Sequence, residues 1–174
     1  MNLNKPLFLI GYMGSGKTTM GKLIAEELHL PFVDTDEVLS EQEGMSCSDI
    51  ICQKGQAYFR QQERNLLNSL PQNKGMVVAT GGGMPCFLDN ISLITSIGIS
   101  LFLDWSVENL AIRLSLTDLS TRPMLLGKSG EELRAHIQKQ LTERMIYYRQ
   151  AHHTIACDGH TDEEMAHRIA QLFL

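Results

Sequence analysis

The residues best suited to chemistry run from Gly11 to Thr18, in the order Gly-Tyr-Met-Gly-Ser-Gly-Lys-Thr. They fit the phosphate-binding pattern G-x-x-x-x-G-K-[ST], follow an apolar segment at 7–10 and open a helical pattern. Glycines let backbone N–H groups approach a chain of phosphates, and the positive end of the following helix adds attraction. Lys17 can reach the β- and γ-phosphates, and the Thr18 hydroxyl can ligate Mg²⁺. The motif predicts a nucleotide-phosphate site, against the simpler alternative of a glycine-rich turn.

Two carboxylates follow the next expected strand. Asp34 and Asp36 lie two residues apart in Phe-Val-Asp-Thr-Asp, and such residues of an extended chain point to the same face. One could hold Mg²⁺ or its water, and the other could accept a proton from an attacking hydroxyl group. A solvated turn with an Asp as helix N-cap explains these residues equally well.

The third expected strand, 76–80, runs into Gly81-Gly82-Gly83 and ends without a carboxylate. Asp34 is therefore the better candidate for a metal partner. The three glycines suggest backbone N–H groups pressed against a small ligand, although a purely structural turn remains open.

Three arginines lie in separate segments: Arg60, Arg122 and Arg144. Arg60 is followed one helical turn later by Glu63, with which it is expected to pair on the helix face. A single arginine on a helix surface is usually only solvated, so the three carry no site without a fold that joins them.

The elements that must position these residues alternate between apolar strands and helical patterns. Short, nearly continuous apolar runs suit strands that are covered on both faces of a parallel sheet. This alternation predicts a three-layer α/β domain in which ligands bind beyond the carboxyl ends of the strands. The expected strands are 7–10, 32–34, 76–80, 100–103 and 154–157.

One connection is unusually long. Residues 115–129 lie between two helical patterns and are rich in Ser, Thr, Asp, Gly and Pro. Loops of this length are often functional lids, and a flexible surface excursion is the alternative.

Length and composition narrow the possible classes of protein. The chain has 174 residues, which predicts one domain spanning 1–174. A net charge of −5 argues against nucleic acid as a partner, and the sequence contains neither a membrane-spanning apolar run nor a signal-peptide core. The four cysteines form no CxxC pair, which favours reduced thiols in a cytoplasmic protein. A monomer is the default expectation.

Taken together, the motifs resemble shikimate kinase in order over nearly the whole chain. They are GYMGSGKT, FVDTD, FRQQE, TGGG, RP in the long connection and ERMIYY. The resemblance implies a P-loop kinase fold with a five-stranded parallel sheet and a lid. It also implies transfer of a phosphoryl group from ATP to the 3-hydroxyl of shikimate, with Mg²⁺, on the route to chorismate and aromatic amino acids.

The resemblance also implies roles for single residues. Asp36 would be the base that takes the proton of the reacting hydroxyl, and Arg122 would stabilise charge on the transferring phosphoryl group. Asp34 would lie with Thr18 at the metal, and Arg113 would lie beside the adenine. The residues that would bind the ATP phosphates are Gly14, Ser15, Gly16, Lys17, Thr18 and Thr19. Those that would bind shikimate, besides Asp36, are Arg60 and Arg144 on its carboxylate and Gly82 through its backbone.

Two other readings stay open. Another small-acceptor P-loop kinase, for gluconate or a nucleoside monophosphate, would share the first motif. A nucleotide-binding regulatory module would have lost one of Lys17, Asp36 or Arg122, and this chain has all three.

Overall fold

The computed structural model describes residues 3–117 and 125–174 of the chain. Within them, five strands form one sheet in the order β2-β3-β1-β4-β5, and all neighbouring strands pair in parallel. The predicted five-stranded parallel sheet is therefore confirmed. The strands are β1 Pro6–Ile10, β2 Phe32–Asp34, β3 Met76–Ala79, β4 Ile99–Asp104 and β5 His153–Ala156.

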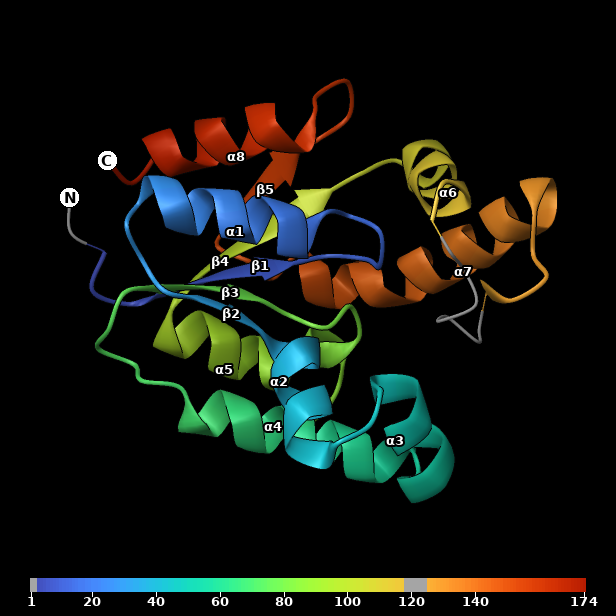
Figure 1. Ribbon diagram of the computed structural model, residues 1–174. Helices are drawn as coiled ribbons and strands as arrows, with labels where there is room; N and C mark the ends of the chain where they lie inside the picture. Colours follow the sequence, from blue (N-terminus) through green and yellow to red (C-terminus); the bar gives the residue numbers. More distant parts are fainter. Residues whose placement is uncertain (1–2, 118–124) are drawn as a thin grey trace.

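Helices cover both faces of the sheet, which makes three layers (Figure 1). Helices α1 (Lys17–Glu27) and α8 (Asp162–Gln171) pack against each other on one face. On the other face lie α4 (Gln56–Ser69) and α5 (Asn90–Ile97).

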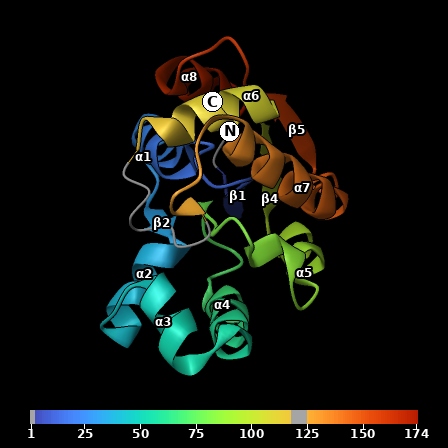
Figure 2. The same cartoon turned by 90° about the vertical axis from the view of Figure 1, so that its right-hand side faces the viewer.

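The remaining helices gather toward the carboxyl ends of the strands, the side that faces the viewer in Figure 2. Here the chain leaves the sheet and returns through connections that can carry a site. These elements are α2 (Thr35–Glu43), α3 (Cys47–Lys54), the short 3-10 helix η1 (Met84–Cys86), α6 (Val107–Ser115) and α7 (Gly130–Tyr148).

The central strands form the core because their side chains are apolar on both faces. Leu7, Phe8, Leu9 and Ile10 of β1 are fully buried, as the continuous apolar run predicts. The predicted strand ends differ from the observed ones by a single residue or match them. Thr80 and Cys157 lie just beyond β3 and β5, yet each still donates its backbone N–H to the neighbouring strand, at 3.1 Å and 3.0 Å.

Residues 118–124 of the expected lid at 115–129 lie outside the described residues. Ser115 is the last residue of α6, and the turn at 125–128 leads into α7. Arg122 also lies outside the described residues. Within the described part of the chain, no helix is long and apolar enough to cross a membrane.

Candidate active site

The phosphate-binding loop, or P-loop, is the Gly11–Thr18 motif, which connects the end of β1 to the start of α1. Gly14 and Gly16 take left-handed backbone conformations with φ of 78° and 85°, which residues with a side chain rarely adopt. Gly16 is the N-cap of α1, so the N–H groups of the first turn of that helix point toward the loop. The glycine spacing of the motif thus produces the expected anion-binding turn.

Lys17 lies inside the curl of this loop and is 8% exposed. Its ammonium group donates to the carbonyl oxygens of Gly11 and Tyr12, at 2.9 Å and 2.8 Å, and to the hydroxyl of Ser15 at 3.2 Å. The positive charge of Lys17 is therefore held at the P-loop by neutral oxygens, and none of these three partners is a carboxylate.

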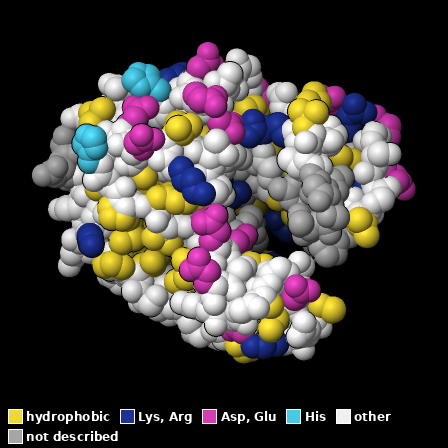
Figure 3. All heavy atoms as spheres, in the orientation of Figure 1, with side chains coloured by type: hydrophobic (Ala, Val, Ile, Leu, Met, Phe, Trp, Pro, Cys, Tyr) yellow, Lys and Arg dark blue, Asp and Glu magenta, His cyan; other side chains and the backbone are white. Residues whose placement is uncertain are grey.

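A crevice of about 530 Å³ opens in front of the loop. Figure 3 shows the molecule hollowed on this side, between the region of α2–α4 and the upper part of the molecule. Nine of the expected site residues line the crevice: Gly14, Gly16, Lys17, Thr18, Thr19, Asp34, Asp36, Gly82 and Arg113. Ser15 is fully buried in the loop behind it.

Asp34 joins β2 to the P-loop helix. Its Oδ2 accepts a hydrogen bond from the Thr18 hydroxyl at 2.6 Å. Its Oδ1 accepts the backbone N–H groups of Asp36 and Glu37, at 3.0 Å and 3.3 Å, so Asp34 is also the N-cap of α2. The Asp34 side chain thus caps α2, as the alternative interpretation predicts, and also contacts Thr18, the expected metal ligand.

The expected extended geometry for Asp34 and Asp36 is wrong. Thr35 already begins α2, because the Asp34 side chain caps the helix and turns the chain away from the strand. Both carboxylates nevertheless line the crevice, since the first turn of α2 starts at its edge.

Asp36 is buried enough to change its acidity. Burial, and next the charge of Asp34, raise the pKa of Asp36, while Lys17 and Arg60 act in the opposite direction. Gly81 leaves room for this carboxylate, since a Cβ at that position would lie 2.5 Å from Asp36 Oδ1. A carboxylate with a raised pKa at the edge of a crevice is suited to accept a proton.

Arg60 and Glu63 form an ion pair of 2.7 Å on α4. The expected pairing is confirmed, but it is buried, because Glu63 is only 1% exposed. Burial raises the pKa of Glu63 to about 7, with Arg60 opposing the shift. The guanidinium of Arg60 lies 4.1 Å from the centre of the Phe87 ring, and a Cβ at Gly83 would come within 2.7 Å of its Nη2.

Arg144 lies on the other side of the glycine turn. A Cβ at Gly82 would be 3.7 Å from Arg144 Nη1, and the Tyr148 hydroxyl donates to the Gly82 carbonyl oxygen at 2.6 Å. The Arg144 guanidinium lies 5.4 Å from the centre of the Tyr12 ring. The fold thus brings Arg60 and Arg144 to the same three-residue turn, although neither lines the crevice itself.

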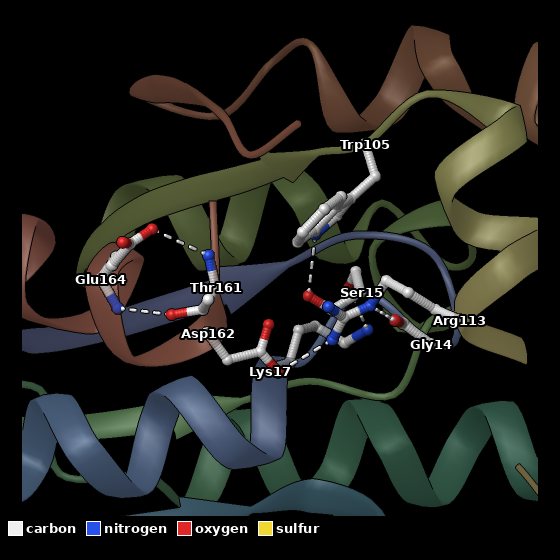
Figure 4. Close-up of polar contacts among 8 residues, drawn as sticks. All are labelled: Gly14, Ser15, Lys17, Trp105, Arg113, Thr161, Asp162 and Glu164. Atoms are coloured by element: carbon white, nitrogen blue, oxygen red, sulfur yellow. Dashed lines mark hydrogen bonds and ion pairs between the residues drawn. The ribbon is translucent and has the colours of Figure 1, made fainter. Parts of the chain in front are cut away.

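Arg113 contacts the P-loop directly. Its Nε donates to the Gly14 carbonyl oxygen at 2.7 Å, and its Nη2 pairs with Asp162 at 2.8 Å (Figure 4). Trp105 donates its indole N–H to the Ser15 carbonyl oxygen at 3.0 Å. Sequence reasoning missed Trp105, Asp162 and Tyr148, because each acts across a long separation in the chain and belongs to no local motif.

Comparisons with known proteins agree with this geometry. The family model described as shikimate kinase matches residues 13–173. A shikimate kinase of Parabacteroides distasonis is 39% identical over 170 residues, which cover 98% of both chains. The crystal structure of a Bacteroides thetaiotaomicron shikimate kinase has a TM-score of 0.88 and 35% identity, covering 97% of this chain and 98% of that one. An Acinetobacter baumannii shikimate kinase, solved in complex with shikimate, has a TM-score of 0.88 and 31% identity, covering 99% and 94%. The chain belongs to the shikimate kinase family.

Proposed function

We propose that the crevice between the P-loop and the Gly81–Gly83 turn is where this chain transfers the γ-phosphoryl group of ATP to the 3-hydroxyl of shikimate. Membership of the family makes the protein an ATP-dependent kinase that acts on shikimate. The observation that carries the proposal for the site is the position of Asp36, which lines the same crevice as Lys17 and lies next to the turn flanked by Arg60 and Arg144.

The nucleotide half of the site, formed by the P-loop, the first turn of α1 and Arg113, binds the phosphates of ATP. The N–H groups at the start of α1 face the phosphate chain, with contacts from Gly14, Ser15, Gly16, Thr18 and Thr19. Lys17 exchanges its carbonyl partners for the β- and γ-phosphate oxygens. Arg113 lies at the adenine side of this half.

The oxygens of Thr18 and Asp34 fit Mg²⁺, a hard cation that prefers oxygen ligands. Within the described residues no cluster of three or more acidic, His or Cys side chains could hold a metal alone. That absence suits Mg²⁺ in kinases, which binds through one or two side chains and the substrate phosphates. When bound, Mg²⁺ offsets charge on the β- and γ-phosphates.

The acceptor half of the site, formed by Asp36, Arg60, Gly82 and Arg144, binds shikimate. Arg60 and Arg144 bind its carboxylate from both sides of the glycine turn, because a guanidinium fork matches the two oxygens of a carboxylate. The backbone of Gly82 contacts the ring substituents. Asp36 accepts the proton of the 3-hydroxyl as that oxygen attacks the γ-phosphorus.

We propose further properties, which the family resemblance and the sequence support. Arg122, in the connection at about 115–129, closes over the transferring phosphoryl group and stabilises its charge. The chain acts as a single domain and as a monomer in the cytoplasm, and it uses neither nucleic acid nor a membrane.

A coupled assay of ADP production tests the proposal. With Mg²⁺ and ATP, we expect turnover with shikimate and none above background with gluconate, AMP or no acceptor. Turnover with another acceptor in place of shikimate would reject the assignment of the acceptor half. ATP binding without turnover on any acceptor would reject the catalytic assignment altogether.

A further inference from the structure

Two carbonyl oxygens of the P-loop accept hydrogen bonds from side chains far along the chain. The indole Nε1 of Trp105, 90 residues after Ser15, donates to the Ser15 carbonyl at 3.0 Å. The Nε of Arg113, 99 residues after Gly14, donates to the Gly14 carbonyl at 2.7 Å. These are successive peptide groups of the loop, and Figure 4 shows both donors reaching them from the side of α6.

The Arg113 side chain is fixed by more than this hydrogen bond. Its guanidinium lies 4.5 Å from the centre of the Trp105 ring, within the range of a cation–π contact. Its Nη2 pairs with Asp162 at 2.8 Å, with side chains only 27% and 15% exposed. Contacts to the loop, to Trp105 and to Asp162 leave the guanidinium little freedom.

Asp162 is itself held in place by the start of α8. Thr161 and Glu164 form a capping box at this helix start, with N···O distances of 3.2 Å and 3.1 Å. Asp162 is the first residue of the helix, so the capping box fixes its backbone next to the loop. A Cβ at Gly16 would lie 2.8 Å from Asp162 Oδ2, which shows how closely the carboxylate approaches the P-loop.

The geometry of the peptide group gives these contacts a consequence for ligand binding. A trans peptide is planar, with its C=O and the following N–H pointing in opposite directions. Holding the Ser15 carbonyl therefore also fixes the direction of the Gly16 N–H, and holding the Gly14 carbonyl fixes the Ser15 N–H. The latter closes the turn by donating to the Tyr12 carbonyl at 3.3 Å.

The loop needs such support because glycine peptides rotate easily. Gly11, Gly14 and Gly16 all have positive φ, and without side chains they have no steric barrier that selects one peptide orientation. A rotated peptide would present a carbonyl oxygen to the phosphates in place of an N–H.

We propose that Trp105, Arg113 and Asp162 form a loop clasp that directs the Gly16 N–H toward the phosphates of ATP and keeps the turn closed by the Ser15 N–H in place. The three are positioning residues that act through the loop backbone, and for Arg113 this role is additional to a position at the adenine side. The proposal rests on the proposed function, in which this loop binds ATP.

The first test is the variant Trp105→Phe, which keeps an aromatic ring under Arg113 and removes the indole N–H. We expect the KM for ATP to rise about two- to tenfold, the effect of one lost hydrogen bond, while the KM for shikimate stays unchanged. A merely structural role would move both constants or neither, and either of those results would overturn the clasp.

The second test uses Asp162→Asn, which removes the charge that holds Arg113 and keeps the side-chain size. We expect the same selective rise in the KM for ATP. The matched control is Asp158→Asn on the same connection, because Asp158 accepts from the backbone N–H of Ser106, at 3.1 Å, and not from a P-loop partner. This control is expected to keep the wild-type KM for ATP, and an equal rise in both variants would overturn the proposal.

Intrinsic fluorescence supplies an independent readout, because Trp105 is the single Trp of the chain. Saturating ADP should change the Trp105 emission in the wild-type protein, and shikimate alone should not. An unchanged emission at saturating ADP, together with wild-type KM values in Trp105→Phe and Asp162→Asn, would overturn the clasp. If the wild-type protein binds ADP but shows no shikimate-dependent turnover, the proposed function fails, and the clasp is then judged by the affinity of Trp105→Phe and Asp162→Asn for ADP.

Discussion

The two halves of the proposed site, one at the P-loop and one at the Gly81–Gly83 turn, differ in how their positive charges are paired. In the nucleotide half, Lys17 and Arg113 are both engaged by groups of the protein, Lys17 by loop oxygens and Arg113 by Asp162 and the Gly14 carbonyl. In the acceptor half, Arg144 belongs to no ion pair of the described residues. Its neighbours include Tyr12, Tyr148 and Cys86, and its charge also acts on Glu63.

This difference indicates two strategies of binding. Side chains from distant elements hold the backbone of the proposed nucleotide half in place. The acceptor half keeps a half-buried cation beside the ion pair of Arg60 and Glu63, and the pKa of that glutamate is raised to about 7. A half-buried guanidinium outside any ion pair of the described residues is stabilised by an anion of the right shape, and the carboxylate of shikimate is such an anion.

The largest effect is expected at Asp36, where the two halves meet. Asp36→Asn removes the proposed base, so kcat should fall about 100- to 10,000-fold, the usual contribution of general base catalysis. Binding of ADP and of shikimate, measured by calorimetry, should stay within a few-fold of wild type. Glu37→Gln, the next residue on α2, is the control and should keep wild-type turnover. A turnover of Asp36→Asn equal to that of the wild-type protein would rule out Asp36 as the base.

Removing a cation from the acceptor half comes next. Arg144→Ala should raise the KM for shikimate about thirtyfold or more, because the substrate carboxylate loses a partner in a desolvated site. The KM for ATP should not change, since the nucleotide half is held independently. Arg149→Ala, at the exposed end of the same helix, is the control. An unchanged KM for shikimate would contradict the carboxylate clamp.

The metal contact tests the nucleotide half in isolation. Asp34→Asn should raise the Mg²⁺ concentration for half-maximal activity about tenfold, as loss of a metal-orienting carboxylate typically does. Asn is as good an N-cap as Asp, so α2 should stay intact. Thr18→Ser keeps the hydroxyl and should keep the wild-type Mg²⁺ dependence. A Mg²⁺ dependence of Asp34→Asn equal to that of wild type would remove Asp34 from the metal site.

The smallest effect concerns stability. Burial raises the pKa of Glu63 from 4.5 to about 7, so the folded protein binds more protons here than the unfolded chain between these values. Stability from this group is therefore present below pH 4.5 and is lost as the pH rises toward 7. We expect the free energy of unfolding by urea to fall between pH 5 and pH 8 by about 2 kcal/mol more in the wild-type protein than in Glu63→Gln. Parallel pH profiles of the two proteins would contradict the buried charge.

Much of the nucleotide half could be predicted from the sequence because its chemistry is local. Gly14, Gly16, Lys17 and Thr18 lie within five consecutive residues, and the loop geometry follows from glycine positions and helix start. The sheet was predictable for a similar reason, since apolar runs buried on both faces are visible in the chain itself.

The remainder of the site depends on contacts that no local pattern encodes. The sequence predicts an extended segment from Asp34 to Asp36, whereas the capping interaction of Asp34 places Asp36 in a helix. Arg60 and Arg144 lie at one turn only because the sheet order brings both of their helices to it. Residue spacing cannot predict this, and the expectation comes from the family resemblance. Trp105 reaches the P-loop only because β4 lies beside β1.

In the proposed function, the acceptor half of the site is organised around a carboxylate, independently of the nucleotide half. Calorimetric titration of the wild-type protein with shikimate and with its methyl ester tests this without any substitution. We predict that the ester binds about thirtyfold or more weakly than shikimate, while the affinity for ADP is the same in the presence and in the absence of shikimate. Equal affinities of shikimate and its ester would contradict the account.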